Sequence, residues 1–251
     1  MYVHTGIKSR IIFIFPPKKK KMEKLKEKPM IMNDVFEEGD VGVKKGSSPS
    51  ALLVFSPIIP GKYPVLLFFH GFVLKPIWYK SLLQHISSHR YIIVAPKLSS
   101  LISQSDEVKR AAKVTEWLGK GLISVLPEKV QPDLLKLAVS GHSRGGKIAF
   151  ALALLHGNST PTPLKFQALV GIDPVAGSSP SCLSAPKILK YIPQSFDQSI
   201  PVAVIGSGLG NQRAHCTLVR TDPLAIGVES ERTEAIPEHY PNSATLNGIN
   251  I

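Results

Sequence analysis

From about residue 50, apolar runs of strand length alternate along the chain with segments of helix length. The runs typical of buried strands are Tyr63–Phe69, Tyr91–Ala95, Leu135–Ser140, Phe166–Ile172 and Pro201–Ile205. The segments between them with helical spacing are Trp78–Ser88, Ser105–Leu118 (with Ser105, Asp106 and Glu107 as its capping region) and Gly145–Leu155. Strands this apolar suit a parallel sheet that helices cover on both faces, so the pattern predicts an α/β fold.

The two ends of the chain differ from this pattern, which suggests three parts. Residues 1–30 contain the basic run Lys18–Lys21 and predict a disordered leader, because like charges in a run repel. The apolar run Ile11–Phe15 is too short for a secretory signal, and no small-residue cleavage site follows it. We expect residues 31–210 to form the α/β domain and residues 211–251 to form a divergent, disorder-prone C-terminal segment.

Composition narrows the class of protein further. A chain with 43% hydrophobic and 19% charged residues is not wholly disordered, and no apolar stretch approaches the roughly 20 residues that span a bilayer. Its two cysteines cannot build a disulfide framework. The net charge of +12 favours anionic partners, but much of the excess lies in the leader. We therefore expect no nucleic-acid partner and leave peripheral contact with an anionic membrane open.

Metal and cofactor motifs are not found in the sequence. It has no H-E-x-x-H and no paired C-x-x-C, so we expect no metal site. The glycines of 206–210 lack the G-x-G-x-x-G spacing of a dinucleotide site, and we expect no cofactor.

The segment Gly141-His142-Ser143-Arg144-Gly145 fits the pattern G-x-S-x-G and lies between a predicted strand and a predicted helix. A sharp turn in this context presents the serine hydroxyl above the sheet, and small neighbours let the backbones approach. The pattern predicts Ser143 as a nucleophile, with an ordinary glycine-rich connection as the alternative.

An acyl-transfer site also needs donors for the oxyanion. His70-Gly71-Phe72 ends an earlier strand. In hydrolases with the G-x-S-x-G turn, the loop after such a strand supplies the second oxyanion donor. We expect the backbone N–H groups of Phe72 and Arg144 to bind the oxyanion.

A serine nucleophile needs a base and an orienting acid. Asp173 follows the strand after the nucleophile, which favours it as the acid, with Asp197 and Asp222 as rivals. Only His215 and His239 follow Asp173 in the chain, and neither follows a recognisable strand.

Four segments together make the sequence similar to plant chlorophyllases, over about Val35 to about Gly210: Phe68–Phe72, Tyr91–Pro96, Gly141–Lys147 with its G-H-S-R-G-G form, and Gly171–Val175. The resemblance implies an α/β-hydrolase that cleaves the phytyl ester of chlorophyll into chlorophyllide and phytol. It gives Ser143 the place of the nucleophile and Asp173 that of the acid. By distance along the chain it gives His239 the place of the base, although the family's Tyr-Gly-His-type segment is missing.

The resemblance also suggests a compartment for the protein and alternative functions. It suggests the chloroplast as the compartment, with cytosol and endoplasmic reticulum open. A general lipase or carboxylesterase would share the site, and a hydrolase-like protein without the family histidine would be impaired in catalysis. The Pro- and Ser-rich segment 178–196 is a candidate lid over an apolar substrate cleft. The sequence carries no prediction of oligomeric state.

Overall fold

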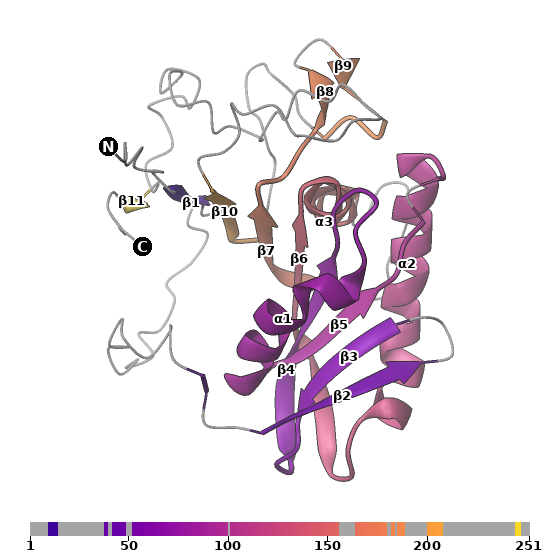
Figure 1. The fold of residues 1–251 in the computed structure, drawn as a ribbon, viewed down its shortest axis with the longest axis vertical. Helices are drawn as coiled ribbons and strands as arrows, with labels where there is room; N and C mark the ends of the chain where they lie inside the picture. Colours follow the sequence, from indigo (N-terminus) through magenta and orange to yellow (C-terminus); the bar gives the residue numbers. More distant parts are fainter. Residues whose placement is uncertain are drawn as a thin grey trace, which may run out of the picture.

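A mixed, mostly parallel β-sheet forms the centre of the fold in the computed structural model of the chain (Figure 1). The structure describes residues 10–14, 38–39, 42–48, 52–99, 101–155, 164–179, 182–183, 185–188, 200–207 and 244–246. The strands of the sheet are β1 Arg10–Ile14, β2 Val43–Ser48, β3 Leu52–Pro57, β4 Gly61–Phe69, β5 Ile92–Pro96, β6 Val130–His142, β7 Phe166–Ile172, β10 Val202–Gly206 and β11 Ala244–Leu246. Within the described ranges their order is β11-β1-β10-β7-β6-β4-β5-β3-β2, and a separate small sheet pairs β8 (Gly177–Ser179) with β9 (Cys182–Leu183).

Helices cover both faces of this sheet. They are η2 Pro76–Tyr79, α1 Lys80–Ser88, α2 Gln104–Gly121, η3 Leu122–Val125 and α3 Arg144–Leu155. One buried cluster joins Leu83 of α1 to Phe55, Phe68 and Ile93 of the strands. A larger cluster on the other face joins α2 and α3 to the alternate residues of the same strands. The apolar strands predicted from the sequence are buried for this reason: all of them contribute to the larger cluster, and β4 and β5 contribute buried residues to both.

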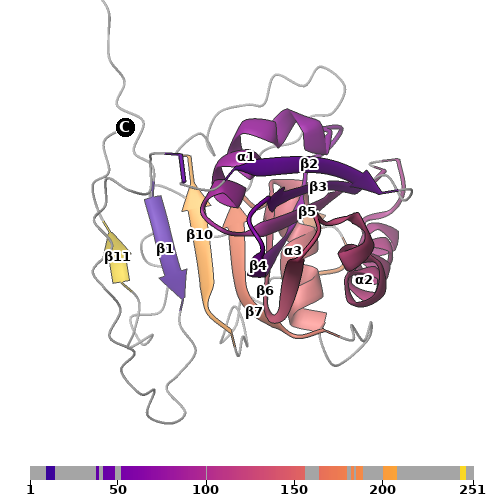
Figure 2. The same ribbon diagram turned by 90° about the horizontal axis from the view of Figure 1, so that it is seen from below.

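The strands β5, β4, β6, β7 and β10 run parallel to one another. The outer strands are antiparallel, with β3 and β2 at one edge and β1 and β11 at the other (Figure 2). The carboxyl ends of the five parallel strands therefore meet at one edge, where α/β proteins place their ligand sites. The predicted α/β fold is confirmed.

The bounds of several strands and helices differ from those that the sequence pattern predicts. The strand predicted over Leu135–Ser140 extends over Val130–His142, and the first turn of the helix predicted from Trp78 is the 3-10 helix η2. The capping region of α2 was placed too late: Ser103, not Ser105, caps the helix, because its Oγ accepts the N–H of Asp106 at 3.1 Å.

Parts of both predicted terminal segments appear as strands. β1 lies within residues 1–30 and pairs with β10, and β11 lies within residues 211–251 and pairs with β1. The division of the chain into leader, domain and C-terminal segment stays a prediction. The candidate lid, 178–196, lies largely outside the described residues.

Candidate active site

Ser143 occupies the turn between β6 and α3 with a backbone φ of 53°. A residue with a Cβ rarely adopts this left-handed backbone conformation, and the conformation persists only where the surrounding structure holds it. Here the Ser143 N–H donates to the carbonyl of Ile172 at 2.9 Å, and the Ser143 carbonyl accepts the N–H groups of Lys147 at 3.2 Å and Val175 at 3.3 Å. The turn is thus fixed to its own helix and to the neighbouring strand end.

Two glycines of the motif make this turn sterically feasible. A Cβ on Gly141 would overlap the backbone of Gly145, and a Cβ on Gly145 would overlap the carbonyl groups of Phe69 and His70. The start of α3 therefore packs directly on the end of β4, where the predicted oxyanion loop begins. This contact brings the two predicted sources of oxyanion donors to one place.

Phe72 and Arg144, whose N–H groups were predicted to bind the oxyanion, are neighbours in space. The Phe72 ring lies 5.2 Å from the guanidinium carbon of Arg144. The same guanidinium donates to the Glu107 carboxylate at 2.6 Å and to the Ile102 carbonyl at 3.0 Å. Glu107 is buried, and burial raises its pKa, while the Arg144 charge opposes that shift. The Arg144 side chain thus holds the loop before α2 against the turn that carries Ser143, and the Arg144 backbone begins α3.

His70 holds the loop His70-Gly71-Phe72, the predicted oxyanion loop, through the carbonyl group of Gly71. Its Nε2 accepts the Leu98 N–H at 3.0 Å, so its Nδ1 carries the proton and donates to the Gly71 carbonyl at 2.8 Å. Burial lowers the pKa of His70, which favours the neutral ring that this pattern requires.

Tyr79 connects the oxyanion loop to the residue before the serine. Its hydroxyl oxygen accepts the Gly71 N–H at 3.1 Å and forms a hydrogen bond of 2.7 Å with Nδ1 of His142. Burial raises the pKa of Tyr79 and lowers that of His142, although the charge of Asp173 opposes the latter shift. Both rings are therefore neutral at neutral pH, and the link stays intact.

Asp173 ends β7 with a φ of 40°, a second left-handed residue at this edge. Its N–H donates to the Ile205 carbonyl at 2.8 Å, and its Oδ1 accepts the Ser207 N–H at 2.8 Å. The two parallel strand ends thus hold the Asp173 carboxylate beside the turn that carries Ser143. Its charge there acts to raise the pKa of His142, against the effect of burial.

Lys147 lies one helical turn after Ser143 and is only 1% exposed. Its Nζ donates to the Ala176 carbonyl at 2.9 Å, which ties α3 to the chain after Asp173. Burial, with the Arg144 charge in addition, lowers the pKa of Lys147 to about 8.

The structure brings together four of the five residues predicted for the site: Ser143, Asp173, Phe72 and Arg144. His239, the predicted base, lies outside the described residues, as do His215, Asp197 and Asp222. In the described part of the chain no three His, Cys, Asp or Glu side chains gather as a metal site would require. The sequence reading missed the supporting roles of Tyr79, Glu107 and Lys147, because no local motif marks contacts between residues this far apart in the chain.

A parallel sheet between helices, with a serine on a strained strand-to-helix turn at its carboxyl edge, defines an α/β-hydrolase. The chlorophyllase family model matches residues 30–234, and the chain belongs to the chlorophyllase family. This match continues past residue 210, where the resemblance noted above ends, and it includes His215 but not His239.

Three relatives illustrate the similarity. The chain is 46% identical over 202 residues to chlorophyllase type 0 of Chenopodium album (74% of this chain, 58% of the relative). It is 46% identical over 167 residues to chlorophyllase-2 of Arabidopsis thaliana (65% and 52%), and 44% identical over 165 residues to chlorophyllase-1, chloroplastic, of Citrus unshiu (64% and 47%). The chain thus spans about half the length of the curated relatives it matches.

Proposed function

We propose that this chain is a serine ester hydrolase that cleaves the phytyl ester of chlorophyll. The observation that carries the proposal is the conformation of Ser143, held at positive φ between two strand ends, in a chain of the chlorophyllase family. A strained serine at the head of a helix is the arrangement that acyl transfer uses.

In the proposed reaction a histidine base takes the Ser143 hydroxyl proton as Oγ attacks the ester carbonyl. The N–H groups of Phe72 and Arg144 stabilise the oxyanion of the tetrahedral intermediate. The protonated histidine then gives its proton to the departing alkoxide, and phytol leaves. Water, deprotonated by the same base, attacks the acyl-enzyme and releases chlorophyllide and free Ser143.

Asp173 orients the base in this proposal. The Ser207 N–H that it accepts leaves its other carboxylate oxygen for the imidazole. His239 is the base suggested by distance along the chain, and His215 is the rival that lies within the family match.

The test is the conversion of chlorophyll a to chlorophyllide by the purified chain, read by the loss of partition into hexane. Ser143→Ala and Asp173→Asn should lower the rate by at least about 10³-fold, whereas the exposed Ser124→Ala should not change it. His215→Ala and His239→Ala identify the base, because only one should abolish turnover.

A short soluble ester tested in parallel separates this function from that of a general carboxylesterase. A chain that cleaves the short ester through Ser143 but leaves chlorophyll intact would contradict the substrate while keeping the chemistry. A chain that cleaves neither ester would fit the impaired hydrolase-like protein.

The proposal includes two finer points. The compartment is the chloroplast, in line with the name of the Citrus relative. Contact with a membrane is peripheral: no helix in the described part has both the length and the apolar character to cross a bilayer.

A further inference from the structure

The chain between β4 and the first turn of α1 exposes an unusual number of large apolar side chains. We name residues 72–82, which include η2 and the start of α1, the exposed loop. Its apolar members and their exposed fractions are Phe72 36%, Val73 60%, Ile77 39%, Trp78 61% and Leu82 39%. Apolar side chains clustered on a surface in this way mark an interaction site.

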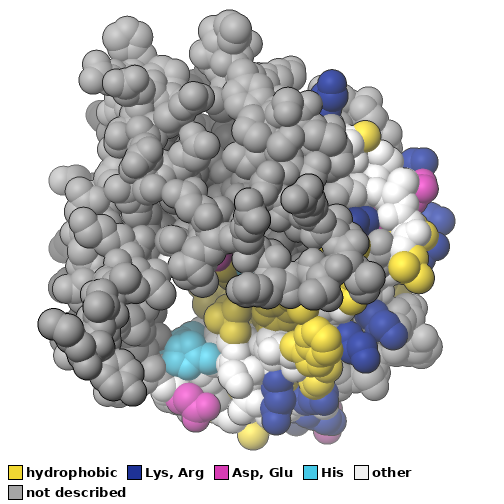
Figure 3. All heavy atoms as spheres, turned by 45° about the horizontal axis from the view of Figure 1, so that its top comes forward, with side chains coloured by type: hydrophobic (Ala, Val, Ile, Leu, Met, Phe, Trp, Pro, Cys, Tyr) yellow, Lys and Arg dark blue, Asp and Glu magenta, His cyan; other side chains and the backbone are white. Residues whose placement is uncertain are grey.

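The two charged residues of the exposed loop itself are both lysines. Lys75 and Lys80 are exposed within the loop, and the Lys75 Nζ lies 5.9 Å from the centre of the Trp78 ring. The sequence contains no Asp or Glu between Asp40 and Asp106. Figure 3 shows hydrophobic side chains beside Lys and Arg side chains on one face of the molecule. The surface is thus complementary to a partner that is both apolar and anionic.

The exposed loop adjoins the candidate active site. It begins at Phe72, which contacts Arg144, and it contains Tyr79, which is linked to His142. A second exposed apolar pair, Ile58 and Ile59, precedes β4 and so lies at the opposite end of that strand. A partner seated on the loop would therefore lie next to the reacting serine.

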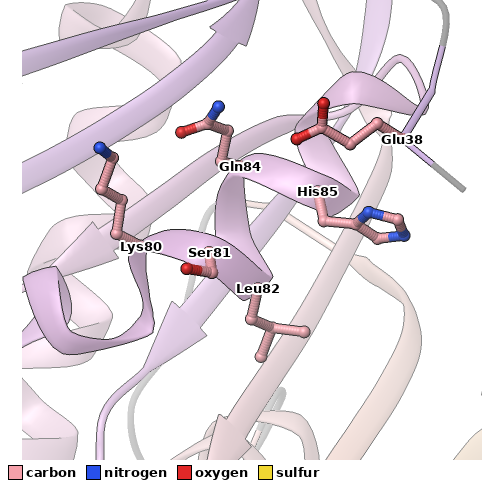
Figure 4. A pocket seen from close by; sticks show the side chains of 6 residues that line it. All are labelled: Glu38, Lys80, Ser81, Leu82, Gln84 and His85. Carbon is pink, nitrogen blue, oxygen red and sulfur yellow. The ribbon is translucent and has the colours of Figure 1, made fainter. Parts of the chain in front are cut away.

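The outer side of α1 beside the loop is polar. A depression of about 470 Å³ there is lined by Lys80, Ser81, Leu82, Gln84, His85 and Glu38 (Figure 4). Lys80 lies at one end, and Glu38 lies with His85 at the other. The acid is thus separated from the lysine, and of the apolar side chains of the exposed loop Leu82 also lines this depression.

We propose that the exposed loop docks the protein on the interface of an anionic lipid bilayer, with Ile77 and Trp78 inserted and Lys75 and Lys80 at the headgroups. Trp is favoured at this depth because its ring is apolar and its N–H is polar. Each lysine near an anionic surface adds attraction that falls within a Debye length. The proposal goes beyond ester cleavage, and its test does not depend on turnover.

Binding of the full chain to vesicles of phosphatidylcholine, with and without phosphatidylglycerol, measures the contribution of the loop. Ile77→Ser/Trp78→Ser should lower the partition coefficient by about tenfold at any ionic strength. Lys75→Gln/Lys80→Gln should lower it by about tenfold at low salt only, because salt screens the attraction. The matched controls, Ile58→Ser/Ile59→Ser and Lys113→Gln/Lys120→Gln, should bind like the unaltered chain.

Trp emission gives a second measurement that does not depend on a destabilising variant. The chain has two tryptophans, so Trp117→Phe leaves Trp78 as the only one. Its emission should shift to the blue on anionic vesicles and be quenched by brominated lipid. Unchanged emission, or loop variants that bind like the controls, would overturn the proposal and assign membrane attraction to the Lys18–Lys21 run. A dimer that Ile77→Ser/Trp78→Ser dissociates, with vesicle binding unaltered, would assign the loop to self-association instead.

Discussion

The hydroxyl of Tyr79 lies 2.7 Å from Nδ1 of His142, although 63 residues separate the two in the chain. The same hydroxyl accepts the Gly71 N–H at 3.1 Å, so one side chain contacts both the loop that precedes Phe72 and the turn that carries Ser143. The position of the proposed oxyanion donor relative to the proposed nucleophile therefore depends on Tyr79.

Tyr79→Phe should lower kcat by about tenfold and leave KM nearly unchanged. The substitution keeps the ring packed on Phe68 but leaves the Gly71 N–H and His142 Nδ1 without this partner. Steady-state cleavage of a short ester measures both constants. Tyr63→Phe is the matched control, since Tyr63 donates to the Ile59 carbonyl away from the site. Equal losses in both variants would show a general effect on folding rather than one on positioning.

Gly145→Ala should abolish activity and destabilise the fold, because its Cβ would overlap the carbonyl groups at the end of β4. Gly119→Ala is the control: no atom lies within 4 Å of its added Cβ, and a helical alanine should stabilise by about 0.5–1 kcal/mol. Urea unfolding and ester cleavage measure the two effects. An active, stable Gly145→Ala would contradict the close approach of α3 to β4.

Lys147 should make stability depend on pH in the alkaline range. Its pKa is about 8 when folded and 10.5 in the unfolded reference, so the unfolded chain binds the extra proton between these values. Stability should therefore rise with pH across this window, by up to about 3 kcal/mol from this residue.

Lys147→Met should remove that rise, whereas the exposed Lys113→Met should keep it. Urea unfolding on either side of the window provides the comparison. A Lys147→Met variant with the same pH dependence as the unaltered chain would show that the folded protein does not perturb this lysine.

The parallel core could be predicted from sequence because each of its strands contains an apolar run of strand length, as in Tyr63–Phe69 and Phe166–Ile172. The outer strands could not. Val43–Ser48 is polar and, among the described strands, pairs with β3 alone, so no hydrophobic pattern marks it. Leu52–Pro57 is apolar, but serines and prolines surround it and resemble loop signals.

The site divides in a similar way. Ser143, Asp173 and Phe72 lie at strand ends, and a parallel sheet collects strand ends at one edge. The partners of Tyr79, Glu107 and Lys147 come from other elements, so their contacts exist only once the chain is folded. The N-cap of α2 was misplaced by two residues because Ser105 stands directly before Asp106 and Glu107, whereas the capping serine, Ser103, lies three residues before Asp106.

The identity of the nucleophile is tested most directly by labelling the full chain with a fluorophosphonate and locating the adduct by peptide mass spectrometry. We predict one adduct, on Ser143, lost in Ser143→Ala and kept in Ser124→Ala. An unlabelled chain that nevertheless cleaves esters, or an adduct that persists in Ser143→Ala, would contradict the account.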